Sequence, residues 1–171
     1  MQLPFLLMGL ACAAMHKGRH NVEIRQATTD DLSSLRAIAA DAYAQYVGLI
    51  GRKPAPMVAD FDHHIRHDIV FVAVMSPNES VVGYVVLMEK ADGVWLENVA
   101  VSTAHNGQGI GTGLMRHVEV YLSGRAASYQ LYTNVKMTRN IGWYERLGFV
   151  ETGRGVENGF ERVYFRKPLS H

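Results

Sequence analysis

A glycine-rich segment in the middle of the chain restricts the fold more than any other feature. Residues 105–115 read HNGQGIGTGLM, with a glycine at every second position from 107 to 113. The segment follows a strand-like run at 94–101 and leads into a helix-like run from about 111 to 124. A strand end, a glycine turn and a helix N-terminus together present unpaired backbone N–H groups and a positive dipole end. The pattern therefore predicts a main-chain site for a phosphate.

Two widespread nucleotide-binding patterns do not fit this loop. The Walker pattern ends in Gly-Lys-Ser/Thr, whereas Gly113 is followed by Leu114. The dinucleotide pattern needs a third glycine where this chain has Thr112 or Leu114, and it opens a βαβ unit rather than following a hairpin. ATP and NAD are therefore poor candidates. An ordinary tight turn between strand and helix remains the alternative, although four alternating glycines exceed what such a turn needs.

Hydrophobic periodicity and turn residues divide the chain into alternating elements. Thr28 and Asp31 have the spacing of a capping box just before the first helix. The pattern predicts a mixed α/β (α+β) fold, with a mostly antiparallel central sheet and helices on both faces. The expected strands are 22–27, 69–75, 80–89, 94–101, 128–135, 149–154 and 161–168, the expected helices are 32–47, 60–68, 111–124 and 138–147, and the segment 51–57 is expected to be an extended connection.

The N-terminus differs in composition from the rest of the chain. Residues 3–15 form an apolar run of signal-peptide length, but no positive charge precedes it and it is too short to span a bilayer. We expect an apolar extension at 1–21, or a helix packed on the domain, with export or lipidation at Cys12 as the alternative. A single domain is expected at 22–171, because no linker or repeat interrupts it.

Charge and cysteine content limit the partners of the chain. The formal net charge is +1, so neither nucleic acid nor an anionic membrane is an expected partner. Cys12 is the single cysteine, which excludes an intrachain disulfide and a thiolate metal cluster and favours a cytoplasmic setting. His63 and His67 have the i,i+4 spacing of metal ligands, but no acidic residue completes a known zinc motif. We expect no metal.

Two segments resemble the signatures of the GNAT superfamily of N-acetyltransferases. ENVAVSTAHNGQGIGTGLM, at 97–115, is similar to the acyl-CoA-binding motif of that family, with Asn106 where the family usually has Gln or Arg. LYTNVKMTRNIGWYERLGF, at 131–149, resembles the second signature, in which Tyr144 is followed by Gly148 and Phe149. The resemblance covers roughly residues 22–169, and it implies acetyl-CoA as the co-substrate.

The resemblance implies where coenzyme A binds. In this family the strand at 94–101 splays away from the strand at 128–135, and the unpaired backbone of the first strand bonds the pantetheine arm. Asn140 is expected at a pantetheine amide, with a contact on the helix face as the alternative. The expected cofactor-binding residues are thus Val99, Ala100, Val101, Asn106, Gly107, Gln108, Gly109, Ile110, Gly111, Thr112 and Asn140.

Two side chains are candidates for catalysis. The resemblance implies that Tyr144 is the general acid that protonates the leaving thiolate, and a core tyrosine on an amphipathic helix is the alternative. Glu97 is the candidate base, because a carboxylate is costly within a central strand unless it is paired or functional. Strand alternation places Trp95, Glu97 and Val99 on one face. A structural ion pair, or a carboxylate that orients the substrate, is the alternative for Glu97.

The resulting hypothesis is an N-acetyltransferase that moves the acetyl group of acetyl-CoA to a primary amine within a ternary complex. The alternatives are a non-catalytic acyl-CoA sensor on the same fold and an acetyltransferase for protein lysines or N-termini. A homodimer is common in the family, but no residue here supports one. Tyr43, Tyr46 and residues 51–57 fall in the acceptor region, and the two tyrosines have the helical spacing of core residues.

Overall fold

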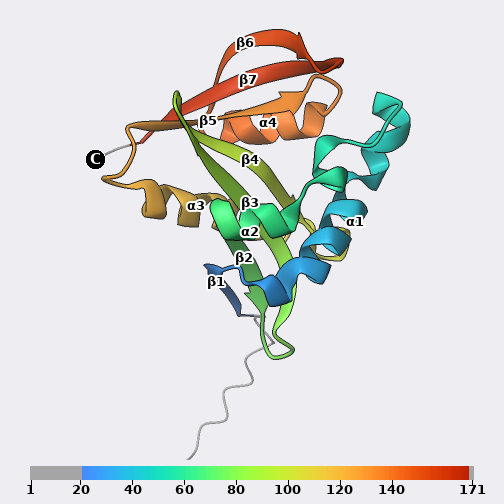
Figure 1. The fold of residues 1–171 in the computed structure, drawn as a ribbon, viewed down its shortest axis with the longest axis vertical. Coiled ribbons are helices and arrows are strands. Elements are labelled where there is room, and N and C mark those ends of the chain that lie inside the picture. The colour runs from blue at the N-terminus through green and yellow to red at the C-terminus, as the bar shows by residue number, and fades with distance from the viewer. Residues whose placement is uncertain (1–20, 170–171) are drawn as a thin grey trace, which may run out of the picture.

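A seven-stranded sheet runs through residues 21–169, which are the residues described in the computed structural model (Figure 1). Its spatial order is β1-β2-β3-β4-β5-β7-β6, and every neighbouring pair is antiparallel except β4 and β5. The mixed, mostly antiparallel sheet is therefore confirmed. The strands are β1 (Val22–Gln26), β2 (Ile69–Met75), β3 (Ser80–Lys90), β4 (Gly93–Val101), β5 (Ser128–Asn134), β6 (Val150–Glu157) and β7 (Phe160–Pro168).

Four α-helices lie near the expected positions. They are α1 (Leu32–Ile50), α2 (Phe61–His67), α3 (Ile110–Leu122) and α4 (Thr138–Arg146), and the short 3-10 helices are η1 (Thr29–Asp31), η2 (Ala55–Val58) and η3 (Thr103–His105). The prediction of a wholly extended connection at 51–57 was wrong. Pro54 and Pro56 lie at the start of η2, where a fixed φ suits a helical turn and the missing N–H has no partner to lose.

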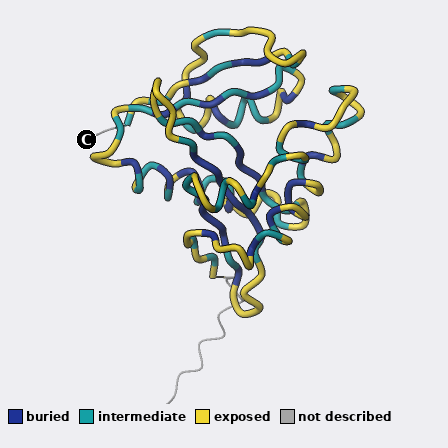
Figure 2. The backbone as a smooth tube through the Cα atoms, in the orientation of Figure 1, coloured by how far each residue is buried: buried dark blue, intermediate teal, exposed yellow. Residues whose placement is uncertain are grey.

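The sheet separates two apolar cores, so helices on both faces are confirmed. Along β2, Val70 and Val72 face the core built with α1 and α2, whereas Phe71 and Ala73 face the core built with α3 and α4. Figure 2 shows the buried stretches along the central strands and exposed backbone at the turns. None of the helices in residues 21–169 is long and apolar enough to cross a membrane. The apolar run at 3–15 and Cys12 lie outside the described residues.

The two parallel strands in the centre of the sheet pair over a short distance. β4 and β5 are in register at three pairs, Val94 with Tyr129, Trp95 with Gln130, and Leu96 with Leu131. Both strands then continue, to Val101 and Asn134, without pairing to each other. The splay that the family resemblance implied is thus present, and it divides the sheet at the level of Glu97.

Glu97 occupies a β-bulge, which corrects the expected side-chain alternation. Val86 pairs with Asn98 and Leu87 pairs with Leu96, so Glu97 is the extra residue on β4. Across the bulge, Leu96 and Val99 join the core beneath α3, although strict alternation would separate them. The prediction that Glu97 and Val99 share a face was therefore wrong. A bulge adds one residue to one strand and re-aims its side chain.

The start of the first helical segment is fixed by one buried carboxylate. Asp31 accepts hydrogen bonds from the backbone N–H of Thr28 at 2.8 Å and from both terminal nitrogens of Arg25 at 2.8 and 2.9 Å. The contact between Thr28 and Asp31 agrees with the predicted capping box. The hydrogen bonds from Arg25 lower the pKa of Asp31 below its ordinary value. The pair ties the edge strand β1 to the helix that covers the sheet.

We expect Asp31→Asn to lower the free energy of unfolding at neutral pH by about 1–2 kcal/mol, because a neutral amide replaces a hydrogen-bonded carboxylate. Because the pKa of Asp31 is lower in the folded state, its carboxylate stabilises the fold at pH values above the unfolded-state pKa of about 3.9. This stabilisation is lost as the pH falls through the folded-state pKa. The deficit should therefore persist down to about pH 4 and shrink below it. Urea unfolding at several pH values measures it. Asp30→Asn, at the exposed neighbour, is the matched control, and an equal loss in both variants would contradict the role of Asp31.

Candidate active site

Two cavities meet where β4 and β5 part. The first, of about 660 Å³, lies between the end of β4, the glycine loop and α4, and is called the loop cavity here. The second, of about 180 Å³, lies between residues 96–99 of β4, residues 132–134 of β5 and the connection before α2, and is called the inner cavity. Both cavities are lined by Tyr43, Val99, Asn140 and Tyr144. These four side chains form the wall between two binding spaces.

The loop cavity collects the residues that the sequence assigned to coenzyme A. Gln108 is the exception, because it is exposed and does not line the cavity. The other expected residues lie in the wall, and they are Val99, Ala100, Val101, Asn106, Gly107, Gly109, Ile110, Gly111, Thr112 and Asn140.

The glycine loop has the backbone geometry of an anion site. Gly107 and Gly109 have φ values of 77° and 79°, in the left-handed region that favours glycine. Gly111 is needed for space, because a Cβ there would lie 3.2 Å from the Trp143 ring. The first helical bond runs from the Gly113 N–H to the Gly109 carbonyl at 2.9 Å. The N–H groups at 107–112 have no acceptor among the described residues, so they are available to a phosphate.

One carboxylate of α1 hydrogen-bonds the segment that precedes the glycine loop. Asp41 accepts hydrogen bonds from the Thr103 backbone N–H at 2.7 Å and from the Thr103 hydroxyl at 2.8 Å. The bond from the backbone of Thr103 is the largest cause of the lowered pKa of Asp41. His105 follows in the same turn and lines the loop cavity. Its Nδ1 is buried and has no hydrogen-bond partner among residues 21–169.

Tyr144 stands at the junction of the two cavities. The residue is 5% exposed and packs against Phe149 and Phe165. Its hydroxyl makes no hydrogen bond within the described part of the chain. Burial raises the pKa of Tyr144 well above that of a free tyrosine, so the hydroxyl is protonated at neutral pH. The arrangement offers one O–H donor to a group at the boundary of the cavities.

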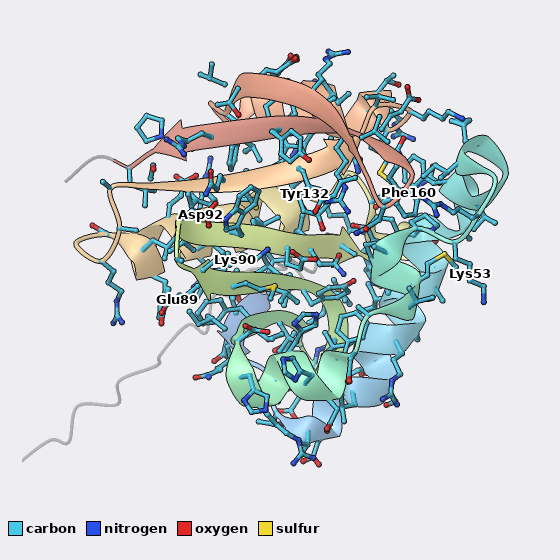
Figure 3. All side chains as sticks on the ribbon, turned by 45° about the horizontal axis from the view of Figure 1, so that its top comes forward. Lys53, Glu89, Lys90, Asp92, Tyr132 and Phe160 are labelled. Atoms are coloured by element: carbon cyan, nitrogen blue, oxygen red, sulfur yellow. The ribbon has the colours of Figure 1, made fainter. Side chains whose placement is uncertain are left out.

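Glu97 faces the inner cavity and has two partners. The Tyr132 hydroxyl donates to Glu97 Oε1 at 3.1 Å, and Lys90 Nζ lies 3.7 Å from Oε2. Burial is the main cause that raises the pKa of Tyr132 to about 12, so its hydroxyl remains a donor at physiological pH. Figure 3 shows Tyr132 and Lys90 on neighbouring parts of the sheet. Glu97 is thus both paired and accessible from the cavity.

The sequence did not identify Asn98 as a site residue, and it placed Tyr43 in the acceptor region with the spacing of a core residue. The buried Tyr43 hydroxyl lies 2.9 Å from the Val99 carbonyl and 3.2 Å from Asn98 Oδ1, so α1 holds β4 beside the cavities. Tyr46 connects α1 to α4, because its hydroxyl donates to Asn140 Oδ1 at 3.3 Å. Helical spacing alone cannot separate such tyrosines from core tyrosines. Asn98 could have been recognised from the sequence, because an amide within a buried strand needs a hydrogen-bond partner.

The outer wall of the inner cavity is built from segments distant in sequence. Arg52 donates to the Asn158 carbonyl at 2.6 Å and lies 3.3 Å above the ring of Phe160. These contacts join the connection after α1 to the turn between β6 and β7. Figure 3 shows Phe160 and Lys53 in these two segments. Arg162, two residues further along β7, also lines the cavity, and nothing in its local sequence indicated this.

The histidines of α2 contact neighbouring side chains along the helix. His64 Nδ1 lies 2.8 Å from Asp68 Oδ2, and the rings of His63 and His67 stand 4.5 Å apart. In the part of the chain that the structure describes, no group of three or more His, Cys, Asp or Glu side chains is arranged to hold a metal ion.

Comparisons with known proteins agree with this geometry. The profile of the acetyltransferase (GNAT) domain family matches residues 66–151. A search of curated proteins found no match. Among solved structures, the ribosomal-protein-S18-alanine N-acetyltransferase from Escherichia coli superposes with a TM-score of 0.71 at 22% identity, covering 88% of this chain and 96% of that one.

Two further solved structures have the same fold. A GCN5-related N-acetyltransferase from Rhodopseudomonas palustris gives a TM-score of 0.72 at 17% identity, covering 90% of this chain and 99% of that one. The PaiA N-acetyltransferase from Thermoplasma acidophilum, solved in complex with coenzyme A, gives 0.71 at 15% identity, covering 86% and 99%. At such identities these structures establish the fold that this chain shares with them.

We expect Gly109→Ala to weaken the binding of acetyl-CoA about 10-fold, because an alanine in the left-handed region costs about 1–2 kcal/mol and would shift the loop. Calorimetric titration with acetyl-CoA measures the change. Gly113→Ala is the matched control, since its Cβ would meet Ile24 at an ordinary 3.9 Å. Equal affinity of both variants would mean that the loop geometry does not matter for binding.

Proposed function

The chain belongs to the GNAT acetyltransferase family, and we propose that it transfers the acetyl group of acetyl-CoA directly to the primary amine of a small acceptor. The single observation that carries the proposal is the wall shared by the two cavities. A donor in the loop cavity and an acceptor in the inner cavity would meet at Tyr144. Direct transfer requires both substrates to be bound on either side of one reacting carbon.

The loop cavity is suited to coenzyme A. The N–H groups at 107–112 would bind the pyrophosphate at the positive end of the α3 dipole. The pantetheine arm would lie along β4, where the backbone of Val99 to Val101 has left its pairing with β5. Asn140, oriented by Tyr46, would bond a pantetheine amide. This placement would bring the thioester to the junction of the two cavities.

The amine has to lose its proton before it attacks, because a lysine-like amine has a pKa near ~10.4. Glu97 would accept this proton, either directly or through one water molecule. Attack of the amine nitrogen on the thioester carbon forms the new C–N bond and places negative charge on the carbonyl oxygen. A backbone N–H of Val99 or Ala100, at the free edge of β4, would stabilise that oxygen.

Tyr144 would act when the C–S bond breaks. The departing thiolate needs a proton, and the buried hydroxyl of Tyr144 is the donor at the junction. The raised pKa keeps this hydroxyl protonated but makes it a weaker acid. Bound substrate groups therefore have to stabilise the phenolate as it forms. Solvent then returns the proton to Tyr144.

We expect Tyr144→Phe to lower kcat by about 10²-fold or more while the affinity for acetyl-CoA stays within about twofold. The phenylalanine retains the packing against Phe149 and Phe165 but removes the proton donor. Release of free thiol across an amine panel gives kcat, and calorimetry gives the affinity. Tight binding of acetyl-CoA without any amine-dependent thiol release in the wild-type protein would instead favour a non-catalytic sensor.

We expect Glu97→Gln to lower kcat by about 10²-fold at neutral pH, with a deficit that shrinks as the pH rises toward the pKa of the amine. The reason is that an amine that is already deprotonated in solution no longer needs a base. A pH series of kcat measures this change. Glu89→Gln, at an exposed position on β3, is the matched control. A deficit that is independent of pH would indicate an ion-pair role for Glu97.

A further inference from the structure

The inner cavity carries two opposite charges on its wall. Glu97 and Arg162 both line it, with side chains that are 23% and 9% exposed. A buried charge is costly unless it has a partner or a ligand. In the proposed function Glu97 accepts the proton of the amine, but no step of that reaction uses Arg162. The second charge therefore requires its own explanation.

Arg162 is incompletely paired for a buried guanidinium. It lies on β7 opposite Asn134, and its Nη1 bonds one carboxylate oxygen of Glu157, a residue whose own side chain is 53% exposed. Nε and Nη2 have no hydrogen-bond partner among the described residues. Among the described residues, the side-chain atoms that are fully buried without a hydrogen-bond partner are Tyr84 Oη and His105 Nδ1. Nε and Nη2 of Arg162 are not among them, so both atoms remain accessible. The guanidinium thus has donors left for a ligand in the cavity.

Tyr132 contacts both charged groups. Its hydroxyl bonds Glu97 at 3.1 Å, and the Arg162 Cζ lies 3.8 Å from the centroid of its ring. The carboxylate and the guanidinium therefore both contact one side chain, the first at its hydroxyl and the second over its ring (Tyr132 is labelled in Figure 3). A small molecule that carries both an amine and a carboxylate can therefore contact the two charges at once, with charge-assisted bonds at each end.

The size of the cavity and the sign of its charges favour the same class of ligand. A volume of about 180 Å³ is below the range of drug-sized pockets, so the acceptor is small. A cationic amine without a carboxylate would be opposed by Arg162. A zwitterion would satisfy both charges, and a guanidinium binds a carboxylate with two parallel bonds. Met137, Phe160 and Leu96 leave apolar surface for a side chain.

We propose that the acceptor is a small amino acid, a primary amine that also carries a carboxylate, and that Arg162 binds this carboxylate while Glu97 faces the amine. The assignment rests on the proposed function of the site as an N-acetyltransferase. It distinguishes this chain from enzymes whose acceptor is a simple amine or the N-terminus of a protein, because neither presents a carboxylate beside the reacting nitrogen.

The experiment compares acceptors that share a side chain and differ at the carboxylate. Leucine, leucinamide and 3-methylbutylamine are suitable, with glycine, β-alanine and γ-aminobutyrate to vary the distance between amine and carboxylate. Free thiol release at saturating acetyl-CoA gives KM and kcat, and calorimetry on the protein saturated with coenzyme A gives binding without turnover. We expect the wild-type protein to bind leucine at least about 10-fold more tightly than leucinamide.

Three variants assign the preference to Arg162. In Arg162→Gln, KM for leucine should rise, because the bonds to its carboxylate are lost, and KM for leucinamide should fall, because the repulsion is removed, so that the two values become similar. Glu157→Gln removes the ion-pair partner but leaves the guanidinium, so the preference should persist. Arg166→Gln, at an exposed position on the same strand, should leave all constants unchanged. Binding of acetyl-CoA in the loop cavity reports whether each variant is folded.

The outcomes separate this inference from the proposed function. Turnover of all three leucine analogues with equal KM in the wild-type protein would overturn the amino-acid assignment and leave the acetyltransferase intact. A preference that survives Arg162→Gln would overturn the role of Arg162. Binding of leucine that depends on Arg162, without thiol release, would support the ligand class and reject the transferase. The wild-type comparison needs no variant, so it decides the assignment even if Arg162→Gln does not fold.

Discussion

The parting of β4 from β5 after three residue pairs is the constraint on which the site depends. A continuous sheet would use the backbone of both strands in its own hydrogen bonds and would leave no room between them. Because the strands separate, one edge of β4 is free, and the two cavities open on either side of Val99. The bulge at Glu97 lies at the same level and turns the carboxylate into the inner cavity.

Contacts on both flanks stabilise the two separated strands. On the β4 side, Tyr43 of α1 bonds the Val99 carbonyl. On the β5 side, β7 pairs with the strand along its whole length, from Ser128 to Asn134. Tyr43 thus satisfies one of the polar groups that the missing pairing would otherwise leave unbonded. The opening is a stable part of the fold, with aromatic and backbone contacts on both flanks.

Local features of the chain were predictable from the sequence. The glycine loop, the capping contact of Asp31 and the order of the elements depend on neighbours within a few residues, and the structure agrees with each. Features set by tertiary packing were not predictable. The bulge at Glu97 depends on the register with β3, and Arg162 reaches the cavity because β7 pairs with β5. The turn η2 was missed because two prolines suit both an extended and a helical start.

The outer wall of the inner cavity comes from the connection after α1 and from the turn between β6 and β7, which Arg52 joins. Neither segment takes part in the loop cavity. Substitutions in these two surface segments can therefore reshape one binding space without disturbing the other. In the proposed function, acceptor recognition and coenzyme A recognition would therefore be free to diverge separately in evolution. For protein engineering, residues 52–60 and 158–160 are the positions at which to alter the inner cavity.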